Sequence, residues 1–366
     1  MKAKIDRRSL VNSLGAVFKA IPAHTTMPIL TCVLVSAADG KVELLANDME
    51  MAIKADIECE VIESGMIAVE AKLLLDIAKK LTDNDVLIET DDAFQVGIKC
   101  GKAKFKLAGR DGSEFPGIPE VEPDDDVTIS QFTLKEIIGQ TIFSIAENDV
   151  NKVMGGELFE INGDKLTVTA LDGHRIAIRK VDLRNSYQPV KVIVPGKVLM
   201  DLSKIVTGEA SEDVQIEFCQ KHIRFMFDNM TVVSRLIEGK YFDVAKMVSS
   251  NYDISVTINR RDLIESIDRA ALLVKEGDKK PIIIEVGNNE MRLSVTSSMG
   301  SMHDTLDVAQ DGGDIKIGFN PKFVNDALRA IDEDEVTLYF TTRTAPCVIK
   351  DEGYFYLILP VNFGGA

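Results

Sequence analysis

The side chains of this 366-residue chain that could hold a metal or act in catalysis are few and scattered. The densest combination is Asp172-Gly173-His174, where a carboxylate and an imidazole two positions apart could be two ligands of a metallophosphatase centre. Such a centre needs further His and Asp ligands, and the three other histidines are dispersed (His24, His222 and His303). We therefore assign no catalytic residue, no metal site and no cofactor, and keep a metal-dependent phosphoesterase only as an alternative.

The sequence signatures of catalysis and nucleotide binding do not occur in this chain. It has no P-loop, G-x-G-x-x-G, G-x-S-x-G or H-E-x-x-H pattern. The acidic run at residues 124–126 follows a proline and is typical of a solvated linker rather than of a cation site. Five cysteines stand apart without a C-x-x-C pair, which is typical of reduced thiols (Cys32, Cys59, Cys100, Cys219 and Cys347). No apolar stretch reaches the about 18 residues of a membrane span, so we expect a cytoplasmic protein without membrane contact.

The elements that would position functional side chains repeat three times along the chain. Segments 5–10, 129–134 and 258–263 each begin with isoleucine and place a leucine five positions later, where an apolar stripe with helical spacing begins. A second helix recurs around lysines that are 125 residues apart, and each copy is followed by an acidic turn and an alternating strand (Lys72, Lys197 and Lys322). Several matching columns in one register indicate an internal repeat.

The repeat predicts the fold class and the domain organisation. We expect an α+β protein made of three tandem copies of one domain, each with two helices packed on antiparallel sheets. The predicted domains are residues 1–121, 127–247 and 253–366, with joints at 116–126 and 249–253. The prolines and aspartates of the first joint are typical of an exposed connection between domains.

The charge of the chain is sorted by structural element. The formal net charge is −16 at pH 7, which by itself would repel the phosphates of a nucleic acid. The six predicted helical segments nevertheless carry +8 together, so the remainder carries −24. Basic residues recur in them at the 125-residue period (Lys79, Lys204 and Arg329). This sorting favours a positive helical surface that contacts phosphates without reading base sequence, although surface helices of many proteins carry lysine.

Five short motifs, in order along the whole chain, resemble those of the bacterial DNA polymerase III beta subunit family. They are Thr-Met-Pro-Ile-Leu at 26–30, Ala-Leu-Asp-Gly-His-Arg-Ile-Ala at 170–177, Val-Pro-Gly-Lys at 194–197, Glu-Gly-Lys-Tyr-Phe-Asp at 238–243 and Leu-Ile-Leu-Pro-Val at 357–361. The resemblance implies three copies of the DNA-clamp domain and a ring-shaped homodimer that closes head to tail, with helices around the hole and sheets outside. It implies a non-catalytic sliding clamp, a processivity factor that encircles duplex DNA without sequence preference.

The resemblance and the charge pattern together indicate which residues face DNA. Four positions follow from the family and three from the periodic basic residues. The predicted DNA-facing set is His24, Lys72, Lys79, Asn148, Lys197, Lys204 and Arg329. The family has arginine at the position of His24, and Val153 and Met154 replace its aromatic pair.

The family also has a pocket between its second and third domains that receives short peptides. Its apolar side chains can bury two anchors of an extended peptide, while an arginine and backbone groups fix polar atoms. Carried over by position, the lining is Met154, Leu171, Gly173, His174, Arg175, Ile176, Phe242, Lys246, Met247, Leu357, Leu359, Pro360 and Val361. Phe242 stands where the family usually has proline, and residues 362–366 extend past the usual end, where they could partly cover the pocket. Any single one of these apolar residues could equally be plain core.

The subunit interface of the family joins an edge strand of the first domain to a helix of the third. The interface residues implied here are Phe105, Leu107, Leu272 and Leu273. Three lysines flank the strand, whereas the matching acidic segment, 297–307, carries only Asp304 and Asp307. We therefore expect an apolar interface with a weakened ionic part.

The leading prediction is a cytoplasmic, nucleoid-associated clamp. Its expected partners are duplex DNA, a second copy of the chain as a homodimer, the replicative polymerase alpha subunit, the clamp loader and other clamp-binding-motif proteins. A non-catalytic scaffold of repeated domains that never meets DNA stays open as an alternative. The scaffold would give the basic helix faces no role, so neutralising them would leave replication unchanged.

Overall fold

The computed structural model describes residues 1–119, 125–147, 151–244, 247, 251–274 and 280–363. The chain divides into two compact units, residues 1–134 with 200–236 and residues 135–199 with 237–366. The predicted middle domain, 127–247, contributes strands to both units because its strands join two different sheets. Two helices, α3 (Gln131–Thr141) and α4 (Gly196–Ile205), accordingly have residues in both.

The first unit is built on one continuous antiparallel sheet. Among the described residues its 13 strands follow the order β10-β13-β14-β15-β4-β3-β2-β6-β9-β8-β7-β1-β5. The strands are β1 Lys2–Asp6, β2 Cys32–Ala38, β3 Lys41–Asn47, β4 Met51–Glu58, β5 Glu60–Glu63, β6 Gly65–Glu70, β7 Asp85–Thr90, β8 Gln95–Cys100, β9 Ala103–Asp111, β10 Asp125–Ser130, β13 Asp213–Phe218, β14 His222–Phe227 and β15 Met230–Arg235. At one corner of this sheet, β3 turns into β4, and β4 pairs with β15. The segment that follows Phe115 lies beside this corner.

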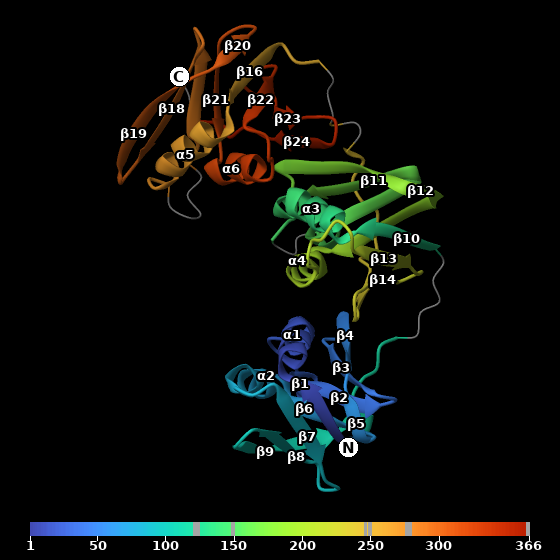
Figure 1. Cartoon of the computed structure of the whole chain (residues 1–366). Coiled ribbons are helices and arrows are strands. Elements are labelled where there is room, and N and C mark those ends of the chain that lie inside the picture. The colour runs from blue at the N-terminus through green and yellow to red at the C-terminus, as the bar shows by residue number, and fades with distance from the viewer. Residues whose placement is uncertain (120–124, 148–150, 245–246, 248–250, 275–279, 364–366) are drawn as a thin grey trace. The chain divides into compact units, whose positions relative to one another are not determined.

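Two helices of the first unit, α1 (Arg7–Val17) and α2 (Ala71–Lys80), lie side by side against its strands (Figure 1). Each begins at a carboxylate, Asp6 or Glu70, that accepts a hydrogen bond from the backbone N–H three positions on. The predicted apolar stripe of α1 is buried (Leu10, Leu14 and Val17). Burial of this stripe, more than helix propensity, holds so short a helix in place.

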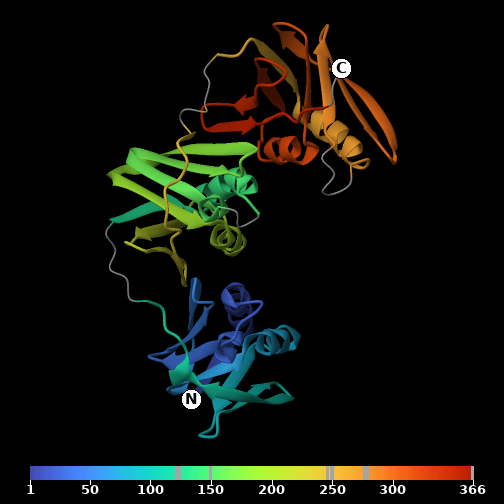
Figure 2. The same cartoon turned by 180° about the vertical axis from the view of Figure 1, so that it is seen from behind.

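The second unit contains two antiparallel sheets, ordered β11-β12-β24-β23-β22-β16-β20 and β19-β18-β17-β21. The strands are β11 Gly156–Leu171, β12 Arg175–Pro195, β16 Ile254–Asn259, β17 Ile282–Gly287, β18 Glu290–Ser297, β19 Gly300–Asp307, β20 Ala309–Asp311, β21 Ile315–Phe319, β22 Glu335–Phe340, β23 Cys347–Lys350 and β24 Tyr354–Ile358. The long hairpin of β11 and β12 is drawn in green in Figure 2. Its turn end, where β12 also pairs with β24, carries the Leu-Asp-Gly-His-Arg motif.

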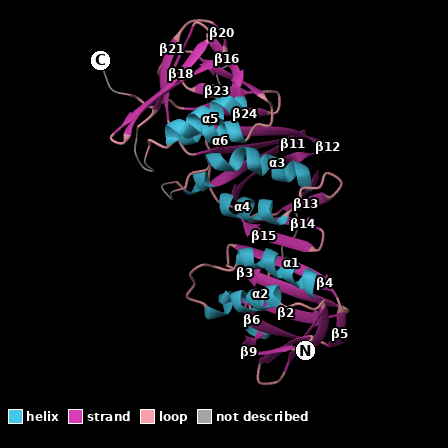
Figure 3. Ribbon diagram, turned by 60° about the vertical axis from the view of Figure 1, so that its left-hand side comes forward, coloured by secondary structure: helices cyan, strands magenta, loops and turns pink. Residues whose placement is uncertain are grey.

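Two further helices, α5 (Arg260–Ala271) and α6 (Pro321–Arg329), pack against each other in the second unit (Figure 3). The apolar stripe of α5 is fully buried, as its spacing predicts (Leu263, Ile267 and Ala270). Short 3-10 turns complete the described structure: η1 Phe18–Ala20, η2 Pro28–Thr31, η3 Gly112–Glu114, η4 Ile142–Ser144 and η5 Lys152–Gly155.

The predicted fold class is confirmed. All strand pairs of the described residues are antiparallel, and each third of the sequence supplies two α-helices. Across the same residues, no helix combines the length and the apolar content that crossing a membrane requires.

Candidate functional site

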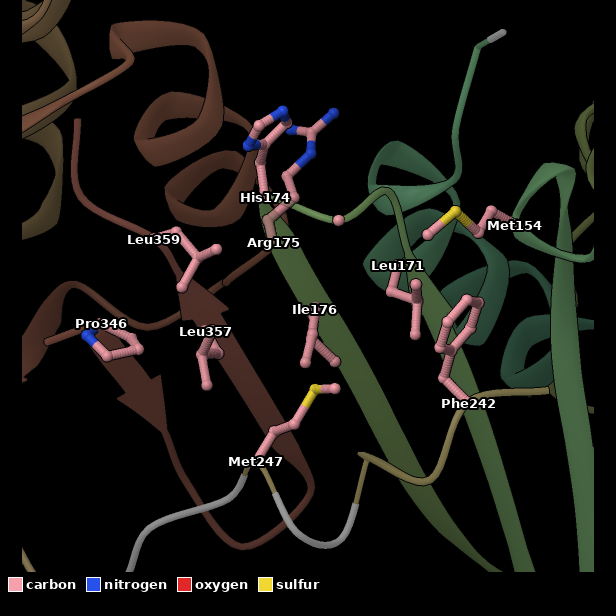
Figure 4. Close-up of a pocket in the computed structure, with 11 residues that line it drawn as sticks. Met154, Leu171, His174, Arg175, Ile176, Phe242, Met247, Pro346, Leu357 and Leu359 are labelled. Atoms are coloured by element: carbon pink, nitrogen blue, oxygen red, sulfur yellow. The ribbon is translucent and has the colours of Figure 1, made fainter. Parts of the chain in front are cut away.

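A cavity of about 390 Å³ lies in the second unit (Figure 4). Its lining is almost entirely apolar, and we call it the main cavity. The described residues that line it are Met154, Leu171, Gly173, His174, Arg175, Ile176, Phe242, Met247, Pro346, Leu357 and Leu359. Ten of these eleven belong to the thirteen residues that the sequence assigned to a pocket, although they come from five separate segments.

Two members of the predicted lining, Pro360 and Val361, are not part of this wall. Lys246 lies outside the described residues. Pro360 and Val361 do not line the main cavity, because the Val361 N–H donates to the Gly318 carbonyl (2.8 Å) on β21. The ring of Phe363 also lies against Gly318, so Val361 and Phe363 lie beside β21 rather than over the cavity. Residues 364–366 lie outside the described part of the chain.

Pro346 lines the main cavity but was not predicted. It precedes β23, the strand that pairs with β24 and brings Cys347 opposite Ile358. Only that pairing puts Pro346 near the motif residues. The sequence did hold a signal for the place of Pro346. A proline directly before a strand is expected at an end of the sheet, and this strand is followed by the Leu-Ile-Leu motif.

Strand register brings the apolar wall together. Leu171 of β11 pairs with Ile176 of β12, and Ile176 pairs with Leu357 of β24. Neighbouring residues on paired strands put their side chains on the same face, so these three form one continuous floor. Figure 4 shows them side by side, with Phe242 and Met247 reaching in from a different segment.

The floor rests on a buried cluster, whereas the rim is accessible. Below the floor, the Tyr241 hydroxyl donates to the carbonyls of Gly156 (3.3 Å) and Thr169 (3.2 Å), and burial raises the pKa of this phenol. At the rim, apolar side chains remain exposed (Phe242 37%, Met247 50% and Leu359 38%). A rigid floor with exposed apolar edges can bury side chains of a ligand at little conformational cost.

Arg175 is a structural element of the rim rather than a free cation. Its side chain is buried and bonds to Asp172 (Nε, 2.9 Å) and to Asp326 of α6 (Nη1, 2.6 Å). Its guanidinium carbon also lies 4.5 Å from the centre of the Phe323 ring. We expected Arg175 to fix polar atoms of a ligand, but two of its nitrogens are already bound to carboxylates.

The same contacts argue against metal chemistry at the Asp-Gly-His motif. The Asp172 carboxylate accepts from the backbone N–H groups of His174 (2.9 Å) and Arg175 (3.0 Å) as well as from the guanidinium. The His174 ring stacks on Phe323 at 6.0 Å. No group of three or more potential ligand side chains able to hold a metal occurs in the described ranges. The motif therefore shapes a turn and a cavity wall.

The predicted DNA-facing residues that the structure describes are all exposed (His24, Lys72, Lys79, Lys197, Lys204 and Arg329), and Asn148 lies outside the described residues. Lys204 pairs with Asp201 of its own helix (3.2 Å), and Arg329 pairs with Asp268 of α5 (2.7 Å). Such exposed pairs contribute up to about 1 kcal/mol, so phosphates can displace them.

The predicted interface residues are accessible to different degrees. Phe105 is exposed and Leu107 half-buried on β9, and within the described residues the 103–108 part of this strand pairs on one side only, with β8. Leu272 is 77% exposed, which is the highest exposure of any large apolar side chain among the described residues. Leu273, by contrast, packs partly against the core of the second unit, so it contributes less free surface than expected.

The ionic part of the predicted interface was expected to be weak, and Asp304, one of its two carboxylates, is already bound within the chain. Asp304 on β19 accepts hydrogen bonds from Arg269 (2.5 Å) and Ser266 (2.8 Å) of α5. The hydrogen bonds from Arg269 and then Ser266 hold the pKa of Asp304 below its ordinary value. This carboxylate is committed within its own chain, which leaves it poorly placed to pair with lysines of another copy.

Comparison with known proteins identifies the family. The N-terminal, central and C-terminal domains of the DNA polymerase III beta subunit match residues 1–119, 128–243 and 246–362. The chain belongs to the DNA polymerase III beta subunit family. It is 36% identical over 375 positions to a beta sliding clamp of Staphylococcus epidermidis and 34% identical to one of Staphylococcus aureus, with 99% of each chain covered.

Solved structures of the beta subunit family have the same fold. A putative DNA polymerase III beta subunit from Eubacterium rectale superposes with a TM-score of 0.95 at 53% identity, covering 99% of both chains. The DNA polymerase sliding clamp of Bacillus subtilis gives 0.95 at 30% identity, covering 100% of both. The beta subunit is a non-catalytic accessory subunit of the polymerase, which sets aside the phosphoesterase alternative.

Proposed function

We propose that this chain is a DNA sliding clamp, a processivity factor that holds the replicative polymerase on its template. The observation that carries the proposal is the match of three beta subunit domains, in order, to nearly the whole chain. In this proposal two copies close head to tail into a ring around duplex DNA in the cytoplasm, at the nucleoid. The three clamp domains are residues 1–121, 127–247 and 253–366.

The charge distribution supports a topological way of holding DNA. A ring stays on DNA because it encloses it, so the phosphate contacts can be weak and independent of sequence. The net charge of −16 keeps DNA away from the outside, and the exposed basic residues of α2, α4 and α6 supply the inner contacts. A scaffold that never meets DNA would have no need for this sorting.

The main cavity supports a second part of the proposal, a site for partner peptides. Its floor of leucine and isoleucine can bury two apolar anchors of an extended peptide, and its rim adds Phe242, Met247 and Leu359. The two methionines of the lining are flexible enough to fit several sequences. The partners of this site would be the polymerase alpha subunit, the clamp loader and other proteins with a clamp-binding motif.

Retention on DNA tests the clamp itself. The protein is loaded with a clamp loader and ATP onto a nicked circular duplex, the complex is isolated, and the DNA is cut once with a restriction enzyme. We expect retention on the circle and release on cutting, because a ring slides off an open end. Equal retention on circular and linear DNA would show ordinary contact binding and contradict the proposal.

Rim substitutions test the peptide site. Phe242→Ala with Leu359→Ala should weaken binding of the polymerase alpha subunit by about tenfold or more, because both side chains are exposed apolar contacts. Phe94→Ala is the matched control, since Phe94 is exposed to a similar degree (42%) in the other unit. Surface plasmon resonance measures both. Equal affinity of the double variant and the control would contradict the assignment.

A further inference from the structure

A second, smaller cavity of about 70 Å³ lies in the first unit, and its lining repeats that of the main cavity. We call it the small cavity. Among the described residues, eight of its ten lining positions stand 124 residues before eight of the eleven that line the main cavity. Asn47 stands at the position of Leu171, Val233 at that of Leu357, and His222 at that of Pro346.

The backbone turn beside each cavity is the same. In the main cavity Asp172 accepts hydrogen bonds from the N–H groups two and three positions on, at 2.9 and 3.0 Å. In the small cavity Asp48 accepts the equivalent bonds at 3.0 and 2.7 Å. The residue after each aspartate has a positive φ, 86° at Gly173 and 74° at Met49. The internal repeat therefore includes the individual hydrogen bonds of this turn.

The neighbouring strand is placed in the same way. The Leu359 N–H donates to the His174 carbonyl (2.8 Å) beside the main cavity. Beside the small cavity the Arg235 N–H donates to the Glu50 carbonyl (2.9 Å), again 124 residues earlier. The two cavities thus share one frame, on which the side chains differ.

The side chain that differs most in chemistry is Asn47. It is 5% exposed, and its Nδ2 lies 3.3 Å from the carbonyls of both Pro116 and Gly117, to which it donates. Its Oδ1 accepts from the Met49 N–H (2.7 Å). The amide therefore ties the segment after β9 across the small cavity. Leu171 has no group that could make such bonds.

A second difference is the charge at the rim. Arg235 takes the position of Leu359, and Glu50 that of His174. An apolar anchor entering the small cavity would have to displace the amide of Asn47 and lie beside two charged side chains. Loss of the two Asn47 hydrogen bonds to backbone carbonyls, and removal of water from the charged side chains, both oppose that step.

We propose that the small cavity is a closed copy of the peptide site, and that Asn47 and Arg235 keep it closed to apolar peptides. The repeat builds the same frame twice, but only the main cavity accepts a partner, so each chain offers one peptide site. The inference rests on the proposed peptide-binding function of the main cavity. Asn47 and Arg235 act as specificity-determining residues, since they exclude partners that the shared frame would otherwise admit.

Calorimetric titration tests the number of sites. The probe is a synthetic octapeptide with leucine and phenylalanine anchors in an otherwise polar sequence, titrated into the full-length chain. Wild type should bind one peptide per chain, and Asn47→Leu with Arg235→Leu should bind two. The reciprocal Leu171→Asn change should weaken binding at the main cavity by about tenfold or more.

The outcomes separate the two proposals. Two peptides per wild-type chain, or one per chain of the double variant, would overturn the closed-copy inference and leave the main cavity as a peptide site. No binding to wild type would overturn the peptide function of the main cavity, and with it the count of one site per chain. Retained binding at the main cavity serves as the folding control for the double variant.

Hydrogen exchange tests the role of Asn47 without any peptide. In Asn47→Ala the amides of Phe115, Gly117 and Ile118 should exchange several-fold faster than in wild type, measured by mass spectrometry. Asn229→Ala is the matched control, because Asn229 also donates a side-chain bond to a backbone carbonyl of the first unit. Unchanged exchange in Asn47→Ala would overturn the tie across the cavity.

Discussion

At the scale of single residues, Glu157 on β11 is the most unusual side chain of the second unit. It is fully buried, and neither carboxyl oxygen has a hydrogen-bond partner. Burial raises the pKa of Glu157 to about 8, although the nearby Thr141 hydroxyl acts in the opposite direction. That hydroxyl donates its one proton to the Ile137 carbonyl (2.8 Å), so the carboxyl has no good donor. Glu157 is therefore protonated in the folded protein at neutral pH.

The buried carboxyl predicts a stability that falls as pH rises. The unfolded chain loses this proton near pH 4.5 and the folded chain near pH 8. Between these values the unfolded state binds fewer protons, so the free energy of unfolding decreases by up to about 1.4 kcal/mol per pH unit. Glu157→Gln should flatten this dependence and make the protein more stable than wild type at pH 8. Urea denaturation at pH 5, 6, 7 and 8 measures it.

The control for this prediction is on the same strand. Glu160→Gln changes a carboxylate that is accessible and paired with Lys191, and it should leave the pH dependence as in wild type. If the free energy of unfolding of Glu157→Gln still falls with pH as steeply as that of wild type, another group is responsible for the pH dependence.

At the scale of elements, the β11–β12 turn depends on its glycine. Gly173 has φ +86°, a left-handed conformation that side chains with a Cβ rarely adopt. An added Cβ would meet only the Met154 Cε at 3.8 Å, an ordinary contact. The backbone, and not crowding, therefore limits substitution here, although the equivalent turn in the first unit accepts Met49 at φ +74°.

We predict that Gly173→Ala lowers the free energy of unfolding by about 1 kcal/mol, the strain of the left-handed backbone. Gly155→Ala is the control, because a Cβ there meets nothing within 4 Å and its φ lies outside the left-handed region. Urea denaturation compares the two variants. An equal effect at both positions would show that backbone strain at the turn is not the cause.

At the scale of the whole molecule, the proposed ring needs a contact between copies. The accessible candidates are apolar, with Phe105 on the edge of β9 and Leu272 after α5. The nearby carboxylate of Asp304 is bound to Arg269 of its own chain. An interface of this kind depends on burial of apolar area more than on ion pairs, and salt affects it little.

Leu272→Glu should weaken the dimer by about tenfold or more, because a charge replaces an apolar side chain that association would bury. Sedimentation velocity from nanomolar to micromolar concentration, at low and high salt, measures the dissociation constant. Ile62→Glu is the control, since Ile62 is also exposed (55%) but lies on β5. Equal dissociation constants for the two variants would place the interface elsewhere.

The sequence by itself determined the repeat, the helices and most of the main cavity. The stripes of α1 and α5 are local patterns of three- and four-residue spacing, and burial of one helix face is enough to fix them. Eight of the lining residues lie in the motifs at 170–177, 238–243 and 357–361, which resemble a known family, and Met154 and Met247 were carried over by position from the same family. Asn148 and Lys246 were predicted too, and they lie outside the described residues.

Only the tertiary structure decided the contacts that join distant parts of the chain. Arg175 meets Asp326 across 151 positions, and Asn47 reaches Pro116 across 69. Local spacing says which face of a strand a side chain occupies, but not which strand becomes its neighbour. For the same reason the sequence alone gives Glu157 as an ordinary polar residue of a strand. Its complete burial, beside Thr141 at the end of α3, is visible only in the folded chain. Pairing between remote strands, which no local pattern encodes, brings together the lining of both cavities.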